Sequence, residues 1–151
     1  MSNWTATTTS HATPEQLLEV LTHPDRIQDW APVDFDVDDW RRLSAGTRTR
    51  VTGRLAGMPV EFDVEVHAAD EAGLRLSADG PIGLDVHYEL AQVSSGAELN
   101  ASVSVRGGGG ITGRLVANAT KALLSAGALQ GATGRIVRAA EGPEHELALA
   151  A

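Results

Sequence analysis

The sequence contains no cysteine among its 151 residues, and aromatic side chains make up only 4% of it. The missing cysteine excludes a disulfide framework and thiol chemistry, and it suits a reducing compartment. With so few aromatic rings, a hydrophobic core has to be built mainly from Val, Leu and Ala. The length is that of a single domain large enough to bury such a core.

Positive charge is also scarce. Lys and Arg total 12 against 20 Asp and Glu, so the formal net charge is −8. Binding to nucleic acid or anionic lipid needs clustered positive charge, and we therefore expect neither partner. The first ten residues carry no basic segment followed by an apolar run, and no apolar stretch approaches the length of a membrane span. We expect a cytoplasmic protein with no stable membrane insertion.

Helix signals follow an N-terminal stretch, Trp4–His11, that is rich in threonine and has strand propensity. Thr13 and Gln16 have the spacing of a capping box, and a proline between them fits the first helical turn. Pro24–Trp30 has the pattern of a second short helix that ends before the next proline. The sequence therefore predicts one strand and then two short helices.

The central part of the chain changes to a period of two. Apolar side chains occupy alternate positions from Val33 onward, most clearly in the segment Val60–His67. Six such runs follow one another up to Val105, separated by short glycine-containing turn signals. Short connections make neighbouring strands antiparallel. We therefore predict a meander of strands with one apolar face and one polar face.

A helical period returns after the four glycines Gly107–Gly110 and continues to about Ala140. Gly127, Gly131 and Gly134 each weaken a helix by roughly 1 kcal/mol relative to alanine. We therefore expect a kink or a break near them. The four-glycine run lacks the Gly-Lys-Ser/Thr ending of a phosphate-binding loop, so we interpret it as a strand-to-helix connector.

This order of elements resembles the START-like or Bet v 1-like superfamily (SRPBCC), and within it the polyketide cyclase/dehydrase type. The segments that carry the resemblance are HATPEQLLEVLTHPDRIQDWAP, SAGTRTRVTG, LDVHYELAQVSSGAEL and the glycine-led terminal helix. The resemblance implies an α+β helix-grip fold, a curved seven-stranded antiparallel sheet wrapped around a long C-terminal helix, with two short helices after strand 1. It implies a single domain over residues 1–141, and we expect a flexible tail at 142–151.

The resemblance also implies an internal cavity for lipids, polyketides or other hydrophobic molecules. Members of this superfamily include carriers, cyclases and hydrolases, so the resemblance alone fixes no reaction. We expect binding of a small hydrophobic ligand, because the inward positions are almost all aliphatic. The alternatives are a polyketide cyclase or aromatase-type enzyme, which would need several inward polar groups, and a regulatory partner-binding protein without a ligand. No catalytic residue can be assigned, and no pattern predicts an oligomeric state.

Ala119, Ala122 and Ala126 on the terminal helix are expected to face the sheet. Either the helix then lies closer to the sheet, or space remains for a ligand, and we expect the space. The entrance is expected near Trp30, Phe35 and the loop around Pro81. Tyr88 is the only phenol on the apolar face, where it is a structural residue, a ligand anchor or a general acid. The predicted ligand-binding residues are Trp30, Phe35, Phe62, Val64, Val86, Tyr88, Val103, Leu115, Ala119 and Leu123.

The polar face offers one pattern that resembles a metal site. Asp85, His87 and Glu89 alternate along one strand, on the face opposite to Tyr88. We interpret that face as solvated, with Arg75 on the neighbouring strand as an ion-pair partner. Arg48 and Arg50 are expected to pair with acidic residues in the same way, and Thr47 and Thr49 to lie on the apolar face near the sheet edge. We therefore expect no metal and no cofactor.

Overall fold

The computed structural model describes residues 2–31, 35–38, 41–55, 57–107 and 109–150, with the backbone alone for residues 2 and 143–150. The strands are β1 (Ser2–Ser10), β2 (Phe35–Val37), β3 (Arg48–Leu55), β4 (Met58–Asp70), β5 (Gly73–Asp79), β6 (Gly83–Val93) and β7 (Gly96–Arg106). The helices are α1 (Pro14–Thr22), α2 (Pro24–Trp30), α3 (Gly110–Ser125) and α4 (Ala128–Ala150). The predicted order of elements is confirmed over these residues.

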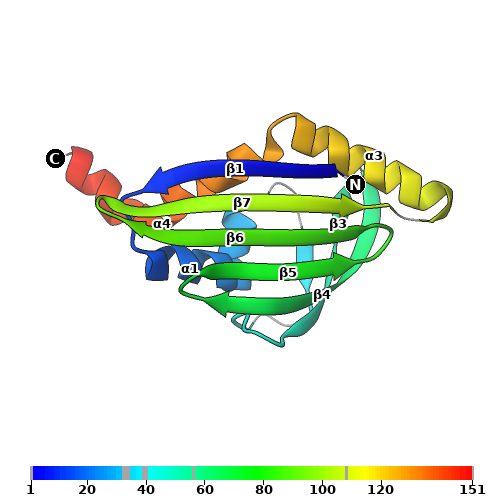
Figure 1. The fold of residues 1–151 in the computed structure, drawn as a ribbon, viewed down its shortest axis with the longest axis horizontal. Coiled ribbons are helices and arrows are strands. Elements are labelled where there is room, and N and C mark those ends of the chain that lie inside the picture. Colours follow the sequence, from blue (N-terminus) through cyan, green and yellow to red (C-terminus); the bar gives the residue numbers. More distant parts are fainter. Residues whose placement is uncertain (1, 32–34, 39–40, 56, 108, 151) are drawn as a thin grey trace.

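The strands form one antiparallel sheet in the order β1-β7-β6-β5-β4-β3-β2. The first strand therefore lies beside the last, as Figure 1 shows, with Trp4 opposite Val103. From β2 to β7 each strand pairs with the next one along the chain, which is the predicted meander. The α+β helix-grip fold is confirmed.

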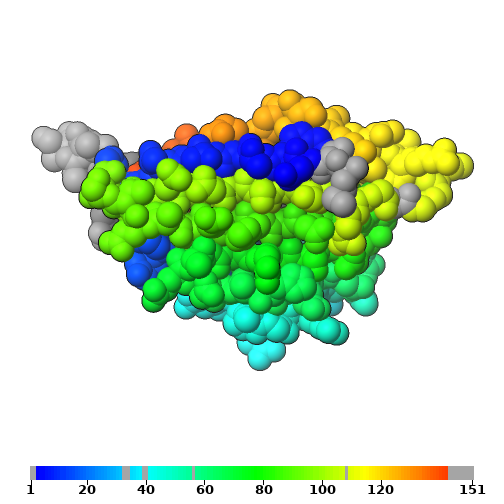
Figure 2. Space-filling model, in the orientation of Figure 1, coloured from blue at the N-terminus to red at the C-terminus, as the bar shows by residue number. Residues whose placement is uncertain are grey.

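The period of two corresponds to two different faces of the sheet. Along β7, Leu99, Ala101 and Val103 are buried, whereas the residues between them point outward and are polar. The outer face carries no helix in the view of Figure 2, where the strands themselves form the surface. The core therefore lies on one side only, between the inner face of the sheet and the helices.

Helix α1 begins with the predicted capping box. The Thr13 hydroxyl accepts a hydrogen bond from the Gln16 backbone N–H at 3.2 Å, and the Gln16 side chain accepts one from the Thr13 backbone N–H at 2.9 Å. These bonds satisfy two N–H groups that a helix start leaves free. Leu17 and Leu21 are fully buried on the other side of the helix. The helix is thereby fixed against α4 and the sheet.

The C-terminal helical segment is broken at Gly127, near the position that the glycine content predicts. Gly127 has a φ of 94°, a left-handed conformation that glycine adopts without a steric penalty. Helix α4 packs against β1, α1 and α2, whereas α3 makes few contacts with the sheet. Figure 1 shows α3 projecting past the end of the sheet where β1 begins. The two halves of the segment therefore have different surroundings.

Helix α4 is interrupted once more at Gly142, whose φ of 73° and ψ of 170° are not helical. This residue coincides with the predicted start of the tail at 142–151. The flexibility of that tail stays a prediction. Within the described residues, every helix is too short or too polar to cross a bilayer.

Candidate ligand-binding cavity

A cavity of about 280 Å³ lies between helices α1 and α2 and the inner face of strands β2 to β6. Its lining is almost entirely aliphatic or aromatic, and none of the lining side chains is charged. The residues that line it are Leu21, Pro24, Ile27, Trp30, Ala31, Phe35, Val37, Leu43, Thr49, Val51, Val64, Leu74, Leu76, Leu84, Val86 and Tyr88.

The strand pairing explains how residues distant in sequence meet in this cavity. Val64 on β4 lies opposite Thr49 on β3, and Val86 on β6 lies opposite Leu76 on β5. Directly opposed residues point to the same face of a sheet. Several of these inward side chains, Val64 and Val86 among them, are only half-buried. The inner face of β3 to β6 is therefore apolar without being fully covered, which is the geometry of a binding cavity.

Trp30 forms one wall and is held in place from both ends. Its indole N–H donates a hydrogen bond to the Val20 carbonyl at 3.2 Å, and Arg135 of α4 donates one to the Trp30 carbonyl at 3.0 Å. Its ring contacts the Tyr88 ring edge-on, with centroids 5.7 Å apart. These contacts tie α2 to α1, to α4 and to the sheet. The wall is therefore preformed and needs no ligand to organise it.

Two hydroxyl groups provide the polar side chains of the cavity. Tyr88 is 6% exposed, and none of the described residues hydrogen-bonds its hydroxyl. Burial raises the pKa of the Tyr88 phenol above its ordinary value, so the group stays protonated at neutral pH. The Thr49 hydroxyl oxygen is buried and also lacks a partner within the described part of the chain. A buried hydroxyl usually has a hydrogen-bond partner, so the Thr49 hydroxyl is unusual among the described residues.

Solved structures match this chain over nearly its whole length. CV1439 of Chromobacterium violaceum superposes with a TM-score of 0.68 at 13% identity, covering 91% of this chain and 96% of that one. TTHA0849 of Thermus thermophilus gives a TM-score of 0.67 at 18% identity, covering 89% and 97%. Ara h 8.0201, which has a Bet v 1-like fold, gives 0.58 at 18% identity, covering 89% and 97%. The chain has the START-like, Bet v 1-like fold.

A further structural match is DynU16, a protein encoded in the dynemicin biosynthetic locus. The TM-score is 0.62 at 21% identity, and the match covers 94% of this chain but 48% of DynU16. This chain therefore spans about half the length of that protein. The sequence itself matches no protein-family model, and it matches no curated protein.

Within this START-like fold, five of the ten predicted ligand-binding residues line the cavity, namely Trp30, Phe35, Val64, Val86 and Tyr88. Their role in binding stays a proposal. The other five lie elsewhere. The cavity has no lining residue from the described parts of α3, α4 or β7, so it lies under α1 and α2 and not, as was expected, between the C-terminal helix and the sheet. Phe62 packs partly buried against the core, Val103 is buried in it, and Ala119 is half-buried on α3. Pro81, expected near the entrance, also lies outside the lining.

The expectation that Leu115 and Leu123 line the cavity is wrong. The expectation that Ala122 and Ala126 face the sheet is also wrong, because both are exposed. Leu115 is 52% exposed and Leu123 is 37% exposed. Helix α3 instead turns Gly113, Val116 and Ala117 inward. The apolar residues of α3 cover more than one of its faces, so the helical pattern did not specify which stripe would be buried. Because the helical segment is broken at Gly127, the face that α3 turns toward the protein does not follow from the face that α4 buries.

Sequence reasoning also missed lining residues. Leu74, Leu76 and Leu84 occupy inward positions of the period-two runs, so the alternation already pointed to them. Thr49 was expected on this face near the sheet edge, and it lines the cavity. Leu43 belongs to the segment between β2 and β3, where no periodic pattern exists. Its backbone N–H donates to the Thr22 carbonyl at 2.7 Å, a contact that no sequence signal predicts.

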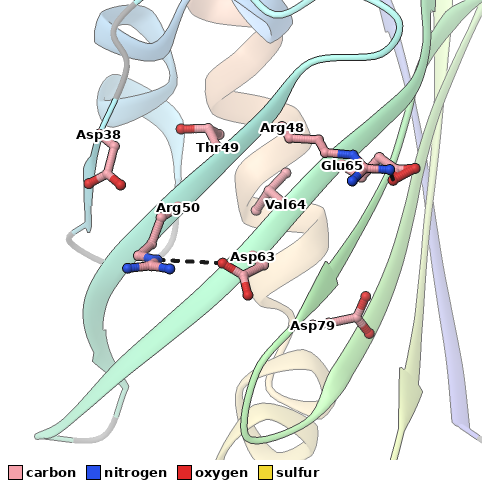
Figure 3. Close-up of a pocket in the computed structure, with 8 residues that line it drawn as sticks. All are labelled: Asp38, Arg48, Thr49, Arg50, Asp63, Val64, Glu65 and Asp79. Atoms are coloured by element: carbon pink, nitrogen blue, oxygen red, sulfur yellow. Dashed lines mark ion pairs between the residues drawn. The ribbon is translucent and has the colours of Figure 1, made fainter.

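A second hollow, of about 600 Å³, lies over β3 and β4 and is lined mainly by charged side chains (Figure 3). Its arginines are already paired. Arg50 lies 2.8 Å from Glu61 and 3.5 Å from Asp63, and Arg48 lies 3.3 Å from Glu65. The predicted cross-strand pairing of both arginines is confirmed. These exposed pairs form a solvated surface that offers no unpaired arginine to a ligand.

The outer face of β6 differs from the prediction in one respect. Asp85 is paired with Arg106 at 2.9 Å, and the same guanidinium reaches Asp79 at 3.1 Å. The hydrogen bond and the charge of Asp85 raise the pKa of Arg106. Arg75, the predicted partner, forms no ion pair within the described part of the chain. Asp85 is therefore engaged in an ion pair on the outer face, away from the cavity.

Proposed function

We propose that this protein binds a small hydrophobic molecule in the cavity between α1, α2 and the inner face of the sheet. The carrying observation is the lining itself, in which inward apolar side chains remain half-buried around an open space. A ligand that covers these side chains removes apolar surface from water on both sides of the contact. Each Å² so removed is worth about 25 cal/mol, part of which offsets the loss of ligand freedom on binding.

The similarity to DynU16 favours a second candidate, an enzyme of the polyketide cyclase or aromatase type. General acid–base catalysis needs a group whose pKa lies near the working pH. The polar side chains that line the cavity are the hydroxyls of Thr49 and Tyr88, and burial moves the Tyr88 pKa further from neutrality. The lining therefore supports binding more strongly than turnover. A regulatory protein that binds only a partner chain would leave the cavity empty.

A cytoplasmic location is part of this proposal. The absence of cysteine supports it, because a chain without disulfides does not depend on an oxidising compartment for its stability. The acidic net charge of −8 supports a small-molecule ligand over a nucleic acid.

Filling the cavity tests the proposal directly. Val64 lines the cavity, so Val64→Phe should occupy the space and weaken the binding of an apolar probe such as naphthalene by about tenfold or more. Val60 is on the same strand and is also partly buried, but it does not line the cavity. Val60→Phe is therefore the matched control and should bind naphthalene like the parent. Equal naphthalene affinity in all three proteins would refute a binding role for this cavity.

A further inference from the structure

The Tyr88 hydroxyl is the feature of the cavity that the proposed function leaves unexplained. Its ring is 6% exposed and lines the cavity, yet its oxygen has no hydrogen-bond partner among the described residues. A phenol both donates and accepts hydrogen bonds. A ligand in the cavity that Tyr88 lines can therefore form a hydrogen bond that the described residues do not make.

The position of Tyr88 is fixed by its neighbours and not by its hydroxyl. On one side its backbone pairs with Leu74 of β5, and on the other with Ala101 of β7. The edge-on contact with Trp30, at 77° between the ring planes, limits the tilt of its own ring. Tyr88 is therefore a rigid part of the cavity lining. Such a preorganised group binds a ligand atom without first having to be ordered.

The rest of the lining restricts the charge of that ligand. None of the lining side chains is ionisable near neutral pH, and the one other polar group is the Thr49 hydroxyl. A carboxylate, phosphate or ammonium group buried beside Tyr88 would have no counter-charge, which is strongly unfavourable in an apolar site. A neutral hydroxyl or carbonyl oxygen requires only the single hydrogen bond that Tyr88 offers.

We propose that the ligand is an uncharged, mainly apolar molecule that carries a hydroxyl or carbonyl oxygen, and that this oxygen hydrogen-bonds the Tyr88 hydroxyl. This inference rests on the proposed function and names its ligand class. It distinguishes neutral hydroxylated or ketonic ring compounds from free fatty acids and phospholipids. Tyr88 acts as a specificity-determining residue, because a plain hydrocarbon would leave its hydroxyl unsatisfied.

Four probes with one ring skeleton test this at neutral pH by calorimetric titration: naphthalene, naphthol, the anion naphthoate and the cation naphthylmethylammonium. We expect the parent protein to bind naphthol about fivefold more tightly than naphthalene. We expect both charged probes to bind at least about tenfold more weakly than naphthol. In Tyr88→Phe the preference for naphthol over naphthalene should disappear, while naphthalene binds at least as tightly as to the parent.

Thr52→Val is the matched control, because it removes a hydroxyl from the same sheet outside the cavity. Thr52 lies on β3 opposite Glu61, is exposed and does not line the cavity. The naphthol preference should therefore survive in Thr52→Val. Unchanged naphthalene binding in Tyr88→Phe shows that the variant retains its cavity.

The outcomes separate the two proposals. Failure of every probe to bind the parent would refute the proposed function together with this inference. Binding of naphthalene with no preference for naphthol, or a preference that Tyr88→Phe leaves intact, would overturn only the inference. Tighter binding of naphthoate than of naphthol would also overturn it, because it would indicate recognition of an anion.

Discussion

The ring of Trp30 lies edge-on against the ring of Tyr88, with 5.7 Å between the centroids and 77° between the planes. One residue comes from a short helix and the other from the sixth strand, so this contact joins the helices to the sheet beside the cavity. The indole N–H is used in a hydrogen bond to Val20. The Trp30 ring therefore shields the Tyr88 phenol from water without providing it with a hydrogen-bond acceptor.

This shielding predicts a pH dependence of stability. The pKa of Tyr88 is raised in the folded protein by burial, relative to an unfolded value near 10. The folded protein therefore holds the phenolic proton more tightly than the unfolded chain does. The free energy of unfolding does not depend on Tyr88 ionisation below about pH 10, and it falls as the pH rises above this value. Tyr88→Phe should lose less stability over that range, as measured by urea denaturation.

The same chain offers a direct spectroscopic check, because Tyr88 is its only tyrosine. The ultraviolet absorbance of the phenolate should appear at higher pH in the native protein than in the urea-unfolded protein. Coincident titration curves would show that the phenol is not shielded in solution.

The unpartnered Thr49 hydroxyl predicts a stabilising substitution. Thr49→Val keeps the shape of the side chain and removes a buried oxygen without a hydrogen-bond partner. The free energy of unfolding should rise by about 1 kcal/mol. Thr49→Ser, which keeps the oxygen, is the control and should not stabilise the protein. A loss of stability in Thr49→Val would show that the hydroxyl has a partner in solution.

The first residue of β5 predicts a strongly destabilising substitution. Gly73 has a φ of 136°, and a Cβ atom there would overlap the Tyr88 carbonyl oxygen. Gly73→Ala should therefore cost about 2 kcal/mol or more. Gly134→Ala is the matched control, because that glycine lies in α4 and a Cβ there meets nothing within 4 Å. It should stabilise the protein by up to about 1 kcal/mol, so equal effects of the two changes would contradict the described packing.

The orientation of α3 is tested by two adjacent residues. Leu115 is 52% exposed and Val116 is 1% exposed. Leu115→Gln should change the unfolding free energy by less than about 0.5 kcal/mol. Val116→Ala should cost about 1–2 kcal/mol, because it leaves a gap in packed surroundings. The reverse order of effects in thermal or urea unfolding would mean that α3 turns its other face to the protein.

Much of this fold was predictable because the relevant signals are local. The capping box of Thr13 and Gln16 and the alternation along β7 both formed as the sequence indicates. Each follows from contacts within a few residues, or from the requirement that one face of a strand be buried. The break near Gly127 was predictable for the same reason, since the conformational freedom of glycine is a local property.

The candidate site was predictable only in part, because it depends on how separate elements are oriented. The inward positions of the strands indicated Val64, Val86 and Tyr88. The rotation of α3 about its axis depends on tertiary packing that the pattern does not encode, and Leu115 was therefore placed on the wrong side. The contribution of α1 and α2 to the cavity likewise follows from where α4 holds them.

Native mass spectrometry of the protein purified from its own host tests the central claim most directly. The account predicts that the parent and Val60→Phe carry the same additional mass of a small apolar molecule, and that Val64→Phe has lost it. An identical bound mass in Val64→Phe, or no bound mass in any of the three proteins, would contradict a ligand-binding role for the cavity beneath Trp30 and Tyr88.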